Sequence, residues 1–218
     1  MNVDIWSDVV CPWCSIGRAR FARALEQFEH RDSVTVVWRS YELDPSAGPS
    51  EGAPAGPGGY AARLAAKYGT SVGEAEERIE HITSVAATEG LDFRFDRMRR
   101  GNTFDAHRLL HLALDRGVQE AAKERIDRAT FSEGLPVSDI DALVQVGVDA
   151  GLDADEVRDV LESEKYADSV RADEAQATAY GIRGVPFFVV DGRYGVSGAQ
   201  TPEVLLDVLQ QAWNDARS

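Results

Sequence analysis

The sequence predicts an α/β protein that is interrupted by a long helical insertion. Residues 2–6 and 33–41 carry strand-like patterns on either side of a helix-like stretch. Residues 60 to about 165 hold several helical patterns and no convincing strand. Two apolar runs around Asp191-Gly192 and a final helical pattern then return the chain to mixed structure. The predicted order is therefore βαβ, a helical block, and ββα.

The first forty residues predict two parallel strands joined by a helix. Val3 and Ile5 share one face of the first strand, and residues 33–41 are rich in β-branched and aromatic side chains. Four apolar residues between the strands recur at the spacing of a helix with one buried face: Phe21, Ala24, Leu25 and Phe28. A strand-helix-strand crossover of this kind favours a right-handed connection within one sheet.

A Gly/Pro-rich stretch separates this unit from the helical block. Residues 45–59 contain nine Gly or Pro residues in fifteen, which predicts a mobile linker or surface loop. Five or six helices are expected after it, because glycines suited to helix C-termini follow successive helical stretches: Gly69, Gly90, Gly117, Gly134 and Gly151. The last helix is expected to begin with Thr201 as its N-cap and Pro202 as its first residue.

Composition excludes several classes of function. The chain has 218 residues, 44% of them apolar, which can fill one domain or one domain with a second inserted in it. Its 23 basic and 37 acidic residues give a net charge of −14, which opposes binding to nucleic acid or to an anionic membrane surface. Neither a bilayer-spanning run nor a secretory signal is evident. We therefore expect a cytoplasmic protein without nucleic acid or membrane partners.

The two cysteines of the chain lie in the segment SDVVCPWCSIG, as Cys11 and Cys14. With Cys11 as a helix N-cap, Pro12 occupies the first helical position and Cys14 the third. A Cys11 thiolate at the tip of this helix could accept hydrogen bonds from free backbone N–H groups and would lie at the positive end of the helix dipole. We predict that Cys11 is an exposed nucleophile and that Cys14 resolves a mixed disulfide on it. Asp8 could oppose the thiolate.

Two other interpretations of the cysteines stay open at this point. They could simply pack at a helix start, although Cys-x-x-Cys after a strand is a specific context for redox chemistry. They could also form half of a Cys₂His₂ zinc site with His107 and His111, which are four residues apart on a predicted helix. The Pro-Trp spacer favours redox exchange, so we predict no metal site.

Three motifs, in their order along the chain, carry a resemblance to a known family. Cys-Pro-Trp-Cys after the first strand and Gly-Val-Pro before a late one resemble the thioredoxin superfamily, specifically DsbA-like proteins. The FrnE-like branch is closer still, through SDVVCPWCSIG, NTFDAHRLLHLA and GVPFFVVDGRYGVSGAQ. The resemblance implies a thioredoxin fold with an inserted all-helical domain. Residues 1–50 and 170–218 would form the thioredoxin-like domain and residues 51–169 the insertion.

The resemblance also implies a substrate site around the disulfide. It implies a cis peptide bond between Val185 and Pro186, with Pro186 beside Cys11 and the Val185 backbone bonding to an extended substrate. Pro12 and Trp13 belong to the same expected substrate site, although Trp13 could instead pack against the insertion.

The segment from Asn102 to Arg108 is similar to a family signature as well. Asn102 is expected to cap a helix whose first turn holds Asp105. His107 is either a packing residue or a substrate-site residue.

The function implied is thiol-disulfide exchange through Cys11 and Cys14 with cysteine-containing proteins or small thiols. No cofactor is required beyond the redox-active disulfide, and glutathione is an expected small-thiol substrate or reductant. Relatives in fold, the kappa-class glutathione transferases and 2-hydroxychromene-2-carboxylate isomerases, offer a glutathione-dependent alternative, and a redox-switched holdase is another. A homodimer is expected by family analogy alone. The chain lacks the export signal and the motif histidine of periplasmic oxidants, so the direction of electron flow stays open.

Overall fold

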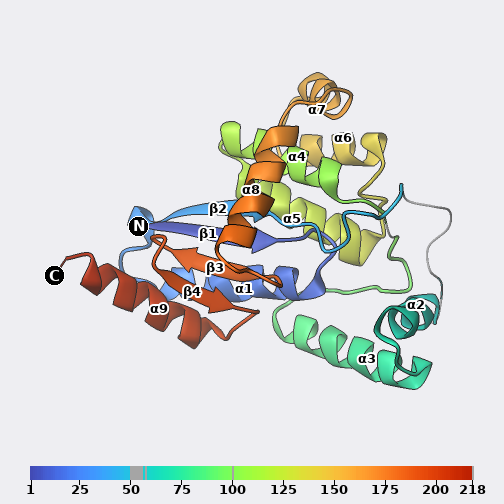
Figure 1. Ribbon diagram of the computed structural model, residues 1–218, viewed down its shortest axis with the longest axis horizontal. Helices are drawn as coiled ribbons and strands as arrows, with labels where there is room; N and C mark the ends of the chain where they lie inside the picture. The colour runs from blue at the N-terminus through green and yellow to red at the C-terminus, as the bar shows by residue number, and fades with distance from the viewer. Residues whose placement is uncertain (50–55, 57, 100, 218) are drawn as a thin grey trace.

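A four-stranded mixed sheet forms the centre of the computed structural model, which describes residues 1–49, 56, 58–99 and 101–217 (Figure 1). Its strand order is β2-β1-β3-β4. The strands are β1 (Asn2–Ser7), β2 (Thr35–Ser40), β3 (Phe187–Val190) and β4 (Tyr194–Ser197). β1 pairs in parallel with β2 and antiparallel with β3, which pairs antiparallel with β4. The sheet is therefore built from two strands of the N-terminal part of the chain and two strands of the C-terminal part.

Alternation along the strands gives the sheet two apolar faces. Val3 and Ile5 of β1 pack with Phe188 of β3 beneath α1 (Pro12–Gln27) and α9 (Pro202–Asp215). On the opposite face, Trp6 and Val189 pack with α8 (Ala167–Ala179). Figure 1 shows α1 and α9 together on one side of the sheet and α8 on the other. The apolar residues on both faces of the central strands are thus removed from water.

Six α-helices lie between β2 and α8 in the described part of the chain. They are α2 (Gly59–Tyr68), α3 (Val72–Thr88), α4 (Phe104–Asp115), α5 (Gln119–Arg128), α6 (Ile140–Asp149) and α7 (Ala154–Leu161). A π-helical turn, Ala129–Glu133, extends α5, and a short 3₁₀ turn, Arg31–Ser33, precedes β2. The glycines predicted to end helices all have positive φ, which confirms that part of the prediction.

Two of the apolar cores in the described part of the helical block each enclose one fully buried residue of the cysteine-bearing segment. Val9, from the turn after β1, is fully buried in the core formed by α4 to α7. Ile16, from α1, is fully buried in a second core with Phe93 and Phe131. The segment between Val9 and Ile16 contains both cysteines, so it is fixed against the helical block at both ends.

Local sequence signals match the structure closely at the hairpin. Asp191 and Gly192 have φ values of 48° and 66°, as the tight turn between β3 and β4 requires. Thr201 is the N-cap position of α9, although its side chain makes no capping hydrogen bond. Residues 50–55 and 57 of the Gly/Pro-rich stretch predicted as a loop lie outside the described residues, as does the predicted domain boundary at 50/51. The boundary at 169/170 falls within α8.

Gly17 is expected to be sensitive to substitution because α1 approaches β3 closely there. A Cβ atom at Gly17 would lie 2.9 Å from Pro186 Cγ, in a ring that cannot move independently of the backbone. Gly17→Ala should lower the free energy of unfolding by about 1–3 kcal/mol, measured by urea denaturation. Gly73→Ala, also within a helix but with no atom near the added Cβ, is the matched control and should not lower it. Equal midpoints for the two variants would contradict this packing.

Candidate active site

The cysteine pair lies at the start of α1 in the frame that the sequence predicts. Cys11 is the N-cap residue, Pro12 is the first helical residue, and Cys14 follows as the third. The first turn is closed by the Cys14 N–H, which donates to the Cys11 carbonyl at 3.0 Å. Both thiols are free. The missing N–H of Pro12 costs nothing at this position, so the motif is compatible with the helix start.

Cys11 is less exposed than the sequence predicts. Only 6% of its surface is accessible, because the segment before β3 covers it. Its thiol donates a hydrogen bond to the Val185 carbonyl oxygen at 3.6 Å, and no backbone N–H of the first turn bonds to its sulfur. The expected capping bond to a Cys11 thiolate is therefore absent in this dithiol form. The Cys11 thiol is instead hydrogen-bonded to the Val185 carbonyl, which belongs to the C-terminal part of the chain.

Cys14 lies one step deeper and is fully buried. Burial raises the pKa of the Cys14 thiol well above its ordinary value, and the neighbouring Cys11 adds to this effect through a hydrogen bond and its charge. The Lys123 ammonium and the Asp8 backbone N–H act in the opposite direction, since both favour the thiolate. The two cysteines thus differ in solvent access and in pKa. Cys11 keeps a small exposed surface, whereas Cys14 is fully buried and its thiol has a raised pKa.

The Val185–Pro186 segment forms the opposing wall of the site. The peptide bond between these residues is cis. Pro186 lies against Gly17 of α1, and its carbonyl accepts the Gly198 N–H at 2.8 Å. The structure therefore brings Val185, Pro186 and Cys11 together from opposite ends of the chain.

Trp13 contacts both solvent and the helical block. Its ring is half-buried and lies 6.2 Å, centroid to centroid, from the His81 ring of α3. It also lines a surface hollow with Ile82. Both expectations for Trp13, packing and access to a substrate, are compatible with this position.

A cavity of about 120 Å³ opens beside Pro12. It is lined on one side by Val10 and Leu43 and on the other by Arg63 and Lys67 of α2. The Nε and one terminal nitrogen of Arg63 are buried without a hydrogen-bond partner in the described part of the chain. Asp8 and Asp44 line the cavity as well, so apolar, basic and acidic side chains surround this space beside the cysteine motif.

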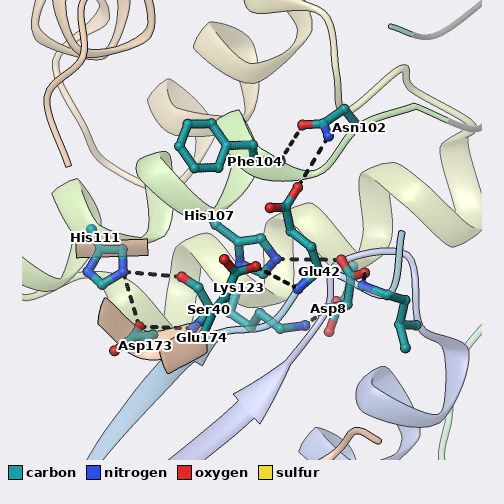
Figure 2. Close-up of polar contacts among 12 residues, drawn as sticks. Asp8, Ser40, Glu42, Asn102, Phe104, His107, His111, Lys123, Asp173 and Glu174 are labelled. Atoms are coloured by element: carbon teal, nitrogen blue, oxygen red, sulfur yellow. Dashed lines mark hydrogen bonds and ion pairs between the residues drawn. The ribbon is translucent and has the colours of Figure 1, made fainter. Parts of the chain in front are cut away.

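Two histidines of α4 each meet a buried aspartate. Figure 2 shows His107 directed toward Asp8, with 3.5 Å between His107 Nε2 and Asp8 Oδ1. One turn along, His111 Nε2 lies 3.1 Å from Ser40 Oγ and 3.2 Å from Asp173 Oδ2. His107 is only 1% exposed, so the structure places it beneath the cysteine segment and not on the surface. Within the described residues, no three His, Cys, Asp or Glu side chains are grouped to hold a metal ion.

Asn102 differs slightly from its predicted role. Helix α4 begins at Phe104 with Thr103 as its N-cap, so Asn102 lies one position earlier than expected. Its side-chain oxygen still accepts the Phe104 N–H at 2.8 Å, and its amide donates to Glu42 at 3.2 Å. Asn102 therefore links α4 to the segment after β2, because its side chain accepts a hydrogen bond from the first and donates one to the second.

Two charged residues near the site were not identified from the sequence. Lys123 of α5 is fully buried, is paired with Asp127, and lies over the Trp38 ring. The Glu42 carboxylate is bound by Arg171 and Asn102, and burial raises its pKa. Both residues resemble ordinary surface charges in the sequence, so only the long-range packing identifies them.

The fold and the paired cysteines define a thioredoxin-fold protein with a Cys-x-x-Cys site. Residues 2–210 match the DSBA-like thioredoxin domain, and the chain belongs to that family. A probable DsbA oxidoreductase from Streptomyces coelicolor is 49% identical, with a TM-score of 0.90 over 98% of this chain and 90% of that one. The predicted thioredoxin fold and the assignment to DsbA-like thiol-disulfide oxidoreductases are therefore confirmed.

More distant solved structures share the fold. A cytosolic disulfide reductase, DsbM, from Pseudomonas aeruginosa, solved with GSH, is 16% identical with a TM-score of 0.69, covering 98% of this chain and 100% of that chain. A 2-hydroxychromene-2-carboxylate isomerase is 15% identical with a TM-score of 0.68, covering 100% of both chains. None of the helices in the described ranges combines the length and the apolar character needed to span a membrane.

The burial difference predicts the order in which the cysteines react. In the reduced protein near neutral pH, iodoacetamide should label Cys11 first, because burial raises the pKa of Cys14 and keeps that thiol protonated. Peptide mass spectrometry across a pH series would locate each label. The denatured chain is the control, in which both cysteines should react at similar rates. Faster labelling of Cys14 in the folded protein would contradict the assigned asymmetry.

Proposed function

We propose that Cys11 and Cys14 form a redox-active pair that exchanges a disulfide with cysteine-containing proteins or small thiols. The observation that carries this proposal is the position of Cys11 between the α1 N-terminus and the Val185 carbonyl, with the buried Cys14 one turn behind it. The attacking sulfur is thereby the accessible one, and the resolving sulfur is protected from outside thiols. The disulfide itself is the redox group, and the proposal requires no metal or added cofactor.

In the reducing direction, the Cys11 thiolate attacks one sulfur of a substrate disulfide. The substrate S–S bond breaks, and its electron pair leaves on the second substrate sulfur. Cys14 then loses its proton and attacks Cys11 in the mixed disulfide, which forms the internal Cys11–Cys14 bond and releases the first substrate sulfur as a thiolate. Two electrons pass from the protein to the substrate. The oxidising direction is the same sequence reversed, and the reduction potential of the pair decides between them.

Substrate contacts are proposed for the residues that surround Cys11. Pro12 and Trp13 present the helix tip, while the Val185 and Pro186 backbone forms the facing wall. When a substrate disulfide displaces the thiol hydrogen bond, the Val185 carbonyl becomes free to accept an N–H from an extended peptide. His107 is too deeply buried to join these contacts.

We further place the protein in the cytoplasm and in the FrnE-like branch of its family. The cytoplasmic location is supported by the low cysteine content, because structural disulfides are rare in that reducing compartment. It is also supported by the likeness to a cytosolic disulfide reductase. The second is supported by the order and spacing of the three motifs along the chain. A homodimer remains a proposal by family analogy.

Replacing either cysteine should block exchange at a different step. Cys11→Ser should reduce dithiol-dependent insulin reduction to the uncatalysed background, because the attacking sulfur is lost. Cys14→Ala should instead accumulate a mixed disulfide on Cys11, visible as a mass increase equal to that of the bound thiol less two hydrogens. His30→Gln is the control, since His30 stacks on Trp213 at the other end of α1 and should leave activity unchanged. Full activity of Cys11→Ser would exclude the proposal.

A second candidate, a glutathione-dependent enzyme, is favoured by the cavity beside Pro12, which Arg63 and Lys67 line. Glutathione carries two carboxylates, and the two Arg63 guanidinium nitrogens that have no partner among the described residues could bind one of them. The solved likenesses include a disulfide reductase with GSH and an isomerase of the same fold.

Calorimetry separates these two functions. For a dithiol exchange enzyme, we expect no tight non-covalent binding of reduced glutathione to Cys14→Ala, because glutathione then serves only as an exchanging thiol. Tight binding that survives in Cys14→Ala and weakens when Arg63→Gln is added would favour the glutathione-dependent enzyme. Lys165→Gln is the charge-matched control, since Lys165 lies over Tyr166 and does not line the cavity.

A further inference from the structure

The cavity beside Pro12 contains buried guanidinium nitrogens whose hydrogen-bonding capacity is unused within the described chain. Val10 and Pro12, the chain neighbours of Cys11, both line this cavity, so it adjoins the residue that carries the attacking sulfur. Helix α2 contributes Arg63 to the lining, and Arg63 Nε and one terminal nitrogen have no hydrogen-bond partner among the described residues. Buried charged donors without an acceptor are costly, so the site favours an anionic ligand.

The two carboxylates that line the same cavity do not satisfy Arg63. Asp8 accepts the Leu43 N–H through Oδ2 at 2.8 Å. Neither Asp8 nor Asp44 forms a hydrogen bond with the two buried Arg63 nitrogens. The negative charges of both aspartates act against an anion in this space. A ligand carboxylate therefore has to bind through direct hydrogen bonds to the guanidinium, which are strong and directional.

Exposed apolar side chains border the cavity. Leu43 and Tyr68 line it, yet 42% of the first and 57% of the second is accessible to solvent. The Lys67 ammonium lies 5.7 Å from the centroid of the Tyr68 ring, which places a second positive charge beside this apolar surface. An apolar rim next to a buried cation suits a ligand that combines an apolar group with a carboxylate.

The size of the cavity indicates a single side chain as the group that enters it. Its volume of about 120 Å³ is well below the roughly 300–1,000 Å³ of pockets that enclose whole small molecules. One acidic side chain fits, and Leu43 and Tyr68 then remain at the rim for neighbouring residues of the same segment. Glutathione has no large apolar side chain to cover them. A protein segment therefore matches this surface better than the tripeptide does.

We propose that Arg63 selects substrate proteins in which an acidic residue and an apolar residue lie within a few positions of the reactive cysteine. This inference rests on the proposed exchange function and names its substrate class. The acidic side chain enters the cavity and accepts hydrogen bonds from Arg63, while the apolar residue covers Leu43 and Tyr68. The net charge of −14 opposes the approach of an acidic segment, and Arg63 and Lys67 offset that repulsion locally.

Arg63 acts on the attack step as a specificity-determining residue and takes no part in the bond exchange. The Cys11 thiolate attacks the substrate sulfur, the substrate S–S bond breaks, and its electron pair leaves on the other sulfur. A carboxylate held by Arg63 keeps the substrate sulfur close to Cys11. The second-order rate constant of attack therefore rises, and the later step at Cys14 is unchanged.

Blocked peptides that carry their cysteine as a mixed disulfide with 2-thiopyridine test this selection on the full-length reduced protein. The cysteine is flanked by Asp-Leu on one side and Leu-Asp on the other, so both binding directions present the same residues. Analogues carry Asn or Lys in place of Asp. Release of uncharged pyridine-2-thione reports attack by Cys11. The Asp peptide should react about tenfold faster than the Asn peptide, and the Lys peptide should react most slowly.

Arg63→Gln should abolish the preference for Asp over Asn and leave the rate of the Asn peptide unchanged, because only the ion pair is lost. Arg63→Lys, which keeps the charge, should retain part of the preference. Arg193→Gln is the matched control, since Arg193 is exposed, lies over the Tyr194 ring and does not line the cavity. It removes the same charge and should leave the preference intact.

Equal rates for the Asp and Asn peptides in the wild type, or a preference that survives in Arg63→Gln, would overturn the inference. Loss of the preference in Arg193→Gln as well would assign it to net charge and also overturn it. So would a preference for glutathionyl 2-thiopyridine over its dimethyl ester with none among the peptides, because the cavity would then serve glutathione. Release no faster than with Cys11→Ser for every peptide would instead count against the proposed function.

Discussion

Burial of Val9 and Ile16 in two different apolar cores is the constraint on which the site depends. Val9 is enclosed by helices α4 to α7, and Ile16 by the aromatic cluster that includes Phe93 and Phe131. The residues between them cannot move as a free loop, because shifting either end would expose a buried aliphatic side chain at a cost of about 1.5–3 kcal/mol. Cys11 and Cys14 are therefore fixed relative to the helical block as well as to the sheet.

This fixed segment explains the unequal chemistry of two cysteines only three residues apart. The α1 N-terminus and the segment before β3 leave Cys11 a narrow opening, whereas Cys14 faces inward with no opening at all. Desolvation then keeps Cys14 protonated, while the buried Lys123 ammonium partly offsets that effect. A substrate can reach one sulfur, and the other acts only after the first has reacted. The order of steps thus follows from burial.

Much of the fold could be predicted from the sequence because its signals are local. The helix frame at Pro12, the hairpin turn at Asp191-Gly192 and the helix-ending glycines each depend on a few consecutive residues. The boundary of α4 was missed by one residue because Asn102 and Thr103 are both suitable caps, and tertiary contacts decide between them.

The deeper part of the site depends on residues that are distant in sequence. Nothing near Asp8 indicates that His107 will meet it, and Lys123 has the pattern of a solvent-facing helix residue. The reduced exposure of Cys11 likewise results from Val185, which the chain brings back only at its other end. Sequence reasoning found both cysteines and the facing proline through motifs. It could not find the partners that surround them, because those partners are selected by the packing of the helical block on the sheet.

The two histidine–aspartate contacts of α4 also determine how that helix is positioned. His107 meets Asp8 beyond the end of β1, and His111 meets Asp173 of α8 and Ser40 at the end of β2. Apolar packing alone tolerates small rotations of a helix, whereas buried polar groups must find their partners or remain desolvated and unpaired. Rotating α4 by one residue, about 100° around its axis, would separate both pairs at once. The same polar contacts that lie beside the cysteines therefore select a single arrangement of the helical block over the sheet.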